Sequence, residues 1–88
     1  MTNASISIVS VRNLGPKTAT ALSEVGIHTR ADLDTVGAVE AYKRLRTRAG
    51  NVSLNALYAM QAGLMDVDWR DLPDELKAAL REAVKATG

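Results

Sequence analysis

The sequence predicts an all-α fold, a compact bundle of about five short helices in a single domain spanning residues 1–88. The apolar fraction is 47%, while aromatic residues make up 3% and Phe is absent, so Leu, Val, Ile and Ala must form most of the core. Many alanines with few β-branched runs favour closely packed helices. Apolar residues also recur at helical spacing in segments separated by glycines, which are typical of helix ends.

Composition excludes several classes of protein. Cysteine is absent, which excludes disulfides, thiolate metal sites and cysteine nucleophiles. We expect a cytoplasmic protein, because a small secreted domain usually needs disulfides. No apolar run approaches the roughly 20 residues of a membrane span, and no basic region precedes an apolar one at the N-terminus.

Charge is distributed unevenly along the chain. The net charge is +1, but residues 1–52 carry seven Lys/Arg and four Asp/Glu, whereas residues 53–88 carry four and six. The N-terminal half is therefore the basic one. This polarity is compatible with nucleic-acid binding without being a strong indication of it.

The chain is organised around the turn Leu14-Gly15-Pro16-Lys17. Pro16 suits the first position of a helix, which we predict over residues 16–25. The free N–H groups of residues 17–19 then point out of a helix N-terminus, an end that attracts anions such as phosphate. Gly26 is predicted to end this helix in the left-handed conformation.

The segment before this turn is harder to assign. Ile6 and Ile8 alternate as in a strand, but no partner strand is evident, and a lone strand leaves its backbone groups unpaired. We therefore predict a short helix or helical turn over residues 5–11, with Ser5 as a possible cap and Ile8 and Val9 facing the core.

Two helices follow the turn. Thr29 and Asp32 have the spacing of a capping box, and Gly37 ends the short helix that they begin. The next helix, over residues 38–48, has an apolar face, and Glu40 is spaced to pair with Arg44. Its basic residues fringe both sides of that face: Lys43, Arg44, Arg46 and Arg48.

The C-terminal half predicts two more helices. Residues 53–62, capped by Ser53, are apolar almost all round, which predicts a central helix ended by Gly63. Trp69 lies in a loop with one helical turn. The last helix, over residues 73–86, is expected to turn Leu80 inward and Lys77, Arg81 and Lys85 outward.

Two resemblances follow from these residues. Leu14-Gly15-Pro16-Lys17, followed by Gly26-Ile27, Thr29 and Asp32-Leu33, resembles the helix-hairpin-helix (SAM-like) type of DNA-binding domain. The part from Gly26 to Leu33 is also similar to the C-terminal domain of the RNA polymerase alpha subunit. On its own this pattern also occurs in hairpins that bind only protein.

A longer set of stretches covers nearly the whole chain: Arg12-Asn13-Leu14-Gly15-Pro16-Lys17, Val25-Gly26-Ile27-His28-Thr29, Asp32-Leu33, Val36-Gly37-Ala38-Val39, Ala41-Tyr42, Ser53-Leu54-Asn55, Leu57-Tyr58-Ala59, Trp69 and Leu72-Pro73. In order and spacing it resembles the C-terminal domain of TfoX (Sxy), the bacterial regulator of DNA-uptake competence. The resemblance implies a small helical domain that activates competence genes together with the cyclic-AMP receptor protein. In the full regulators an α/β domain precedes it, whereas residues 1–88 contain only the helical part.

The candidate DNA contacts are Arg12, Asn13, Gly15, Lys17, Thr18, Arg30, Lys43, Arg44 and Arg46. For the turn residues, the alternative is a helix entry that serves packing alone. For the basic residues of helix 38–48, the alternative, which we favour, is a solvated charged surface. Any contact from these residues would be to phosphate and would not read base sequence.

No catalytic constellation is evident, so we expect no enzyme, metal or cofactor. His28 is the single histidine and has no partner in the pattern for a metal site or a triad. Tyr42 and Tyr58 could stack on bases, but both fall on apolar faces, which favours core packing. Two functions remain. One is a regulatory domain acting through a transcription factor or RNA polymerase component with weak DNA contact, and the other is a protein-interaction module without DNA contact.

Overall fold

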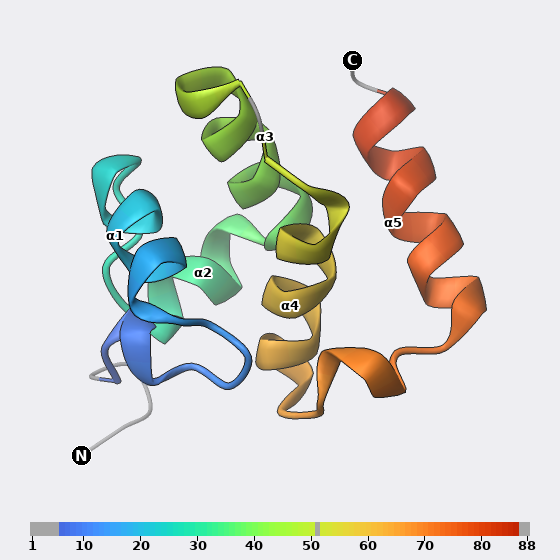
Figure 1. Ribbon diagram of the computed structural model, residues 1–88, viewed down its shortest axis with the longest axis horizontal. Helices are drawn as coiled ribbons and strands as arrows, with labels where there is room; N and C mark the ends of the chain where they lie inside the picture. Colours follow the sequence, from blue (N-terminus) through green and yellow to red (C-terminus); the bar gives the residue numbers. More distant parts are fainter. Residues whose placement is uncertain (1–5, 51, 87–88) are drawn as a thin grey trace.

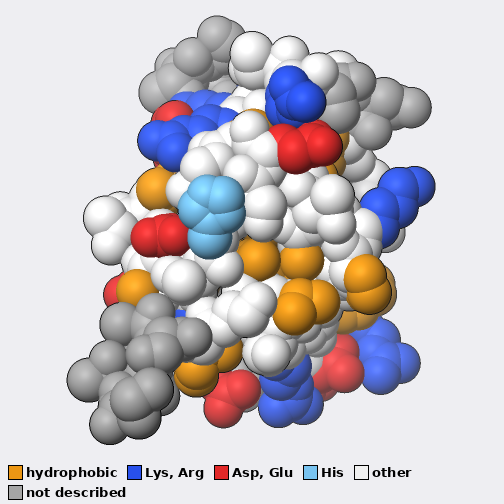
Figure 2. Space-filling view, turned by 90° about the vertical axis from the view of Figure 1, so that its left-hand side faces the viewer, with side chains coloured by type: hydrophobic (Ala, Val, Ile, Leu, Met, Phe, Trp, Pro, Cys, Tyr) orange, Lys and Arg blue, Asp and Glu red, His pale blue; other side chains and the backbone are white. Residues whose placement is uncertain are grey.

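The computed structural model describes residues 6–50 and 52–86. The elements in chain order are η2 (Ile8–Ser10), α1 (Pro16–Glu24), α2 (Arg30–Val36), α3 (Ala38–Ala49), α4 (Leu54–Met65), η3 (Trp69–Asp71) and α5 (Asp74–Ala86). The predicted all-α class is confirmed. In Figure 1, α1 forms one side of the molecule and α5 the opposite side, with α4 between them, and Figure 2 shows the surface on the α1 side.

Helix α4 is the central element, as its all-round apolar sequence predicts. It contacts α2, α3, α5 and η3. Leu57, Met60 and Ala62 are fully buried. Only the ends of the helix reach the surface with large apolar side chains, Leu54 and Met65.

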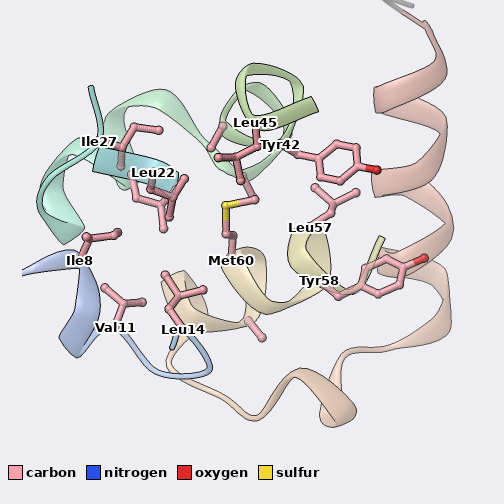
Figure 3. Close-up of a cluster of buried hydrophobic side chains, with 14 of the residues drawn as sticks. Ile8, Val11, Leu14, Leu22, Ile27, Tyr42, Leu45, Leu57, Tyr58 and Met60 are labelled. Atoms are coloured by element: carbon pink, nitrogen blue, oxygen red, sulfur yellow. The ribbon is translucent and has the colours of Figure 1, made fainter. Parts of the chain in front are cut away.

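The hydrophobic core contains buried side chains from η2 and from all five α-helices, with α4 at its centre. Figure 3 shows Met60 of α4 among side chains from η2, α1 and α3. Its flexible thioether suits such an irregular junction. Tyr42 and Tyr58 are buried, which confirms the prediction that they pack in the core.

The N-terminal segment forms the predicted helical turn, and its backbone pairing was not predicted. Ile8–Ser10 is one 3₁₀ turn, and Ser5 lies outside the described residues. The strand-like alternation does have a partner, the loop before α2: the Ile8 N–H donates to His28 O at 3.0 Å, and the Arg30 N–H donates to Ile6 O at 2.9 Å. Sequence spacing gave no sign of this pairing.

Val9 was also expected to face the core, and that expectation is wrong, because 46% of Val9 is exposed. Val11 is buried beside Ile8 instead. A 3₁₀ turn has three residues per turn, so residues three apart share a face.

Gly63 does not end α4, contrary to the prediction. The helix continues to Met65 and ends at Asp66, whose φ is 58°. Gly63 is buried, and a Cβ there would lie 2.7 Å from both the Arg12 carbonyl oxygen and Val11 Cγ1. The chain at residues 11–12 crosses α4 so closely that only glycine fits.

The other helix ends agree better with the predictions. Gly26 follows its helix with a φ of 87°, in the left-handed geometry that was predicted for it. Gly50, the C-cap residue of α3, is left-handed as well, with a φ of 76°. Thr29 and Asp32 form the predicted capping box. Ser53 is the N-cap residue of α4, as predicted, but its side chain makes no cap hydrogen bond.

Helix α5 packs on α3 and α4 through the buried Leu80 and Val84. Lys77 and Arg81 were expected to point outward, but both reach Tyr58. Arg81 Nη1 donates to Tyr58 Oη at 3.0 Å, and Lys77 Nζ lies 5.7 Å from the centre of the Tyr58 ring.

Candidate nucleic-acid interface

The predicted phosphate-binding turn lies at the surface. Gly15 is the N-cap residue of α1, and Gly15 and Lys17 are exposed. The Ala19 N–H was expected to be free, but it donates to Gly15 O at 3.0 Å. The donors of this helix end are therefore the N–H groups of Lys17 and Thr18, which precede the first intrahelical hydrogen bond.

Lys17 and Thr18 line a mostly apolar hollow of about 240 Å³ between α1, α3 and the start of α4. Ser53, the N-cap residue of α4, lines it too. Lys17 is the one basic residue among those that line this hollow.

Arg12, Asn13 and Arg30 have internal partners at the other end of α4. Arg30 Nη2 donates to Leu64 O at 2.8 Å, and Arg12 Nη1 donates to Asp66 O at 3.3 Å. These carbonyls belong to the last turn of α4 and its C-cap, where helices leave acceptors unpaired and cations are favourable. The two arginines thus cap α4.

Asn13 hydrogen-bonds to the segment that connects α4 to η3. Its Nδ2 donates to Val67 O at 2.7 Å, and its Oδ1 accepts the Trp69 N–H at 3.2 Å. Its φ of 74° lies in the left-handed region that asparagine tolerates better than most residues. Its amide therefore has a structural role, and its contact with DNA stays a prediction.

The basic residues of α3 are mixed with acids. Arg44 Nε pairs with Glu40 at 3.2 Å, which confirms the predicted pairing, and Arg48 Nε pairs with Glu24 of α1 at 3.0 Å. These pairs and Lys43 surround an open depression of about 470 Å³. Arg46 lies over the Tyr42 ring, 5.6 Å from its centre.

The candidate residues thus fall into separate places. Lys17 and Thr18 lie at the start of α1, Arg12 and Arg30 at the end of α4, and the α3 group beside the end of α1. On the α1 side of the molecule, Lys and Arg side chains alternate with Asp and Glu and form no continuous patch (Figure 2).

Two acidic residues with lowered pKa stabilise turns. The Asp32 carboxylate accepts the backbone N–H of His28, which lowers its pKa most, and that of Thr29. The side chain of Arg70 and then its backbone N–H lower the pKa of Asp68 to about 2. Asp68 and Arg70 are two residues apart, so the sequence could have indicated this cap. The arginines that cap α4 are far in sequence from their carbonyl partners, so no local pattern indicates them.

The described residues show no metal-binding cluster: within 6–50 and 52–86, no three His, Cys, Asp or Glu side chains gather closely enough to hold an ion. No helix in the same part of the chain is long and apolar enough to cross a membrane.

Comparison with known proteins shows which solved structures and which protein family this chain is similar to. Two crystal structures share the fold: an uncharacterized protein from Listeria monocytogenes in a triclinic form (TM-score 0.85, 25% identity, 92% of each chain covered) and a protein of unknown function from the same organism in a tetragonal form (TM-score 0.84, 25% identity, 92% of this chain and 100% of the other). Comparison with curated proteins gives no match. The family model for the TfoX C-terminal domain matches residues 4–84. On this match, and with the helical fold described above, the chain belongs to the TfoX C-terminal domain family.

Proposed function

We propose that this chain is a non-enzymatic regulatory domain that acts in transcription regulation mainly by contact with another protein. Family membership supports a role in regulation. The observation that favours protein over DNA is that Arg44 and Arg48, two of the basic residues, already pair with carboxylates of the chain. We also propose that the protein is cytoplasmic, as its lack of cysteine predicts.

Electrostatics supports the same preference. Affinity for a nucleic-acid backbone grows with the number of phosphates that cations neutralise. A net charge of +1 gives little long-range attraction, and the basic groups lie in separate places. Weak contact is the most that such a surface supports.

DNA binding through the Leu14-Gly15-Pro16-Lys17 turn is the second candidate. It is favoured by the exposure of Lys17 and by the absence of a carboxylate partner for Lys17 among the described residues. One lysine and one helix end would hold one phosphate, so the complex would be weak and sensitive to salt.

Titrations with labelled protein test the two candidates. One series uses a duplex DNA at about 50 and about 200 mM salt. The other uses purified RNA polymerase and cyclic-AMP receptor protein, which the family resemblance implies as partners. We expect a protein complex that survives the higher salt and DNA binding that does not.

Lys17→Glu is the diagnostic variant, and Lys85→Glu is its matched control, with the same charge change at the exposed end of α5. A protein complex equally strong in both variants supports the proposal. DNA binding lost only in Lys17→Glu, with no complex with either protein, would replace it by the second candidate.

A further inference from the structure

Two arginines share one hollow on the surface. The hollow has a volume of about 330 Å³ and lies between the N-terminal segment and the end of α4. Arg12 and Arg30 line it together with Ser10, Gly63 and Asp66. At Gly63 the backbone of α4 passes so close to residues 11–12 that a Cβ does not fit between them.

Both guanidinium groups are held in place while keeping free donors. Each donates one hydrogen bond to a backbone carbonyl, at 3.3 Å for Arg12 and 2.8 Å for Arg30. A guanidinium has five N–H donors, so most of them remain. A group already fixed loses little conformational entropy when it binds a ligand.

Neither arginine forms a salt bridge with a carboxylate of the described chain, whereas Arg44, Arg48 and Arg70 each do. Asp66 is the one acid that lines the hollow, and it is exposed and unpaired. Asp68 is close enough to Arg12 for their charges to interact, and it also pairs with Arg70. The residues that line the hollow carry two positive charges and one negative charge.

Two of the residues that line the hollow directly follow a large, exposed apolar residue in the sequence. Val9, 46% exposed, precedes Ser10, and Met65, 45% exposed, precedes Asp66. Exposed apolar groups beside arginines are typical of protein interfaces, in which Met and Arg are enriched. A surface that follows a phosphate backbone needs a row of cations instead.

We propose that this hollow binds the side-chain carboxylate of an Asp or Glu on a protein partner, and that an apolar residue next to that acid packs on Val9 or Met65. Guanidinium groups bind carboxylates with paired N–H···O hydrogen bonds, which fixes the orientation of the partner. The inference rests on the proposed function, since it supplies the contact through which the domain would hold another protein.

The test uses nuclear magnetic resonance and two synthetic peptides, Ac-Leu-Glu-Leu-NH₂ and Ac-Leu-Gln-Leu-NH₂, with a short duplex DNA as a third probe. The Glu peptide should shift the Nε–H signals of Arg12 and Arg30 and bind at least about fivefold more tightly than the Gln peptide, as expected for a charge-assisted bond. Equal affinities would overturn the inference, as would a preference of these arginines for the DNA.

Asp66→Asn is the sharpest variant, because it removes the opposing charge and asparagine tolerates the positive φ at this position. It should tighten Glu-peptide binding about threefold to tenfold. Asp34→Asn, the same change at an exposed position of α2 outside the hollow, should leave the affinity unchanged. No gain with Asp66→Asn counts against the carboxylate site.

The full partner complex separates this inference from the proposed function. If RNA polymerase or the cyclic-AMP receptor protein binds the chain and Asp66→Asn leaves that affinity unchanged, the hollow is not the contact, and the proposed function stands. If neither protein binds, the proposed function fails, whatever the peptides show.

Discussion

At the scale of single residues, the close approach of two backbones decides what the chain tolerates. Gly63 lies inside α4, where Ala would ordinarily be favoured by about 0.5–1 kcal/mol. Here the added Cβ would meet a carbonyl oxygen and a valine methyl at 2.7 Å. The oxygen belongs to the backbone at Arg12, so it cannot swing aside as a flexible side chain could.

We therefore predict that Gly63→Ala lowers the free energy of unfolding by about 1–3 kcal/mol, because overpacking outweighs the gain in helix propensity. Chemical denaturation followed by circular dichroism measures it. Asn55→Ala, on the exposed face of the same helix, is the control and should be neutral or slightly stabilising. A stabilised Gly63→Ala would mean that residues 11–12 do not cross α4 at this distance.

Arg12 and Arg30 show why a basic residue is not in itself a nucleic-acid contact. Both were candidates for DNA, and both donate to carbonyls at the end of α4. Their free donors still face a hollow, so the capping role and a ligand role coexist in the same guanidinium groups.

At the scale of elements, two short ones, α2 and η3, begin at caps that contain a carboxylate. The α2 helix has seven residues and η3 has three, too few to be stable by propensity alone. The first begins at the Thr29–Asp32 capping box, and Asp68 accepts hydrogen bonds from Arg70 at the start of the second. Each cap requires an ionised carboxylate.

The pKa of Asp68 is lowered from 3.8 to about 2 in the folded protein, and that of Asp32 is also lowered. A lowered pKa means that the unfolded chain takes up protons first as the pH falls. The stabilisation is therefore complete above about pH 5 and is lost as the pH falls through about 4 toward 2.

We predict that Asp68→Asn flattens the decrease in the free energy of unfolding between about pH 5 and pH 2. Denaturant titrations at a series of pH values measure it. Asp34→Asn, at an exposed position of α2 outside its capping box, should keep the slope of the parent protein. Parallel curves for Asp68→Asn and the parent would show that Asp68 does not contribute.

At the scale of the whole molecule, α4 couples the two sides of the fold. It contacts α2 and α3 on one side and α5 on the other. Met60 is fully buried and lies on the side of α4 that faces Leu22 of α1 and Leu45 of α3 (Figure 3). A cavity at this position affects contacts from several elements at once. We expect the described part of the chain to unfold as one cooperative unit.

Accordingly, Met60→Ala should lower the free energy of unfolding by about 2–5 kcal/mol. Circular dichroism, which reports all helices, and the fluorescence of Trp69, which packs against the core, should shift together. Met65→Ala, at an exposed end of the same helix, should change the free energy by less than about 0.5 kcal/mol. Separate transitions for the two probes would show that α4 does not unite the fold.

The sequence by itself determined the class of the fold, its five α-helices and most of their ends. Such features are local. Helical spacing of apolar residues, a glycine with positive φ such as Gly26, and the Thr29–Asp32 box each act within a few residues.

Only the tertiary structure decided what the remaining residues do. The pairing of Ile6 with Arg30, the need for glycine at position 63 and the capping of α4 by Arg12 and Arg30 join residues that the sequence keeps far apart: 34 positions from Arg30 to Leu64 and 54 from Arg12 to Asp66. An unpaired carbonyl can be satisfied by a donor from anywhere in the chain, so the spacing of residues along the sequence does not reveal which donor will reach it.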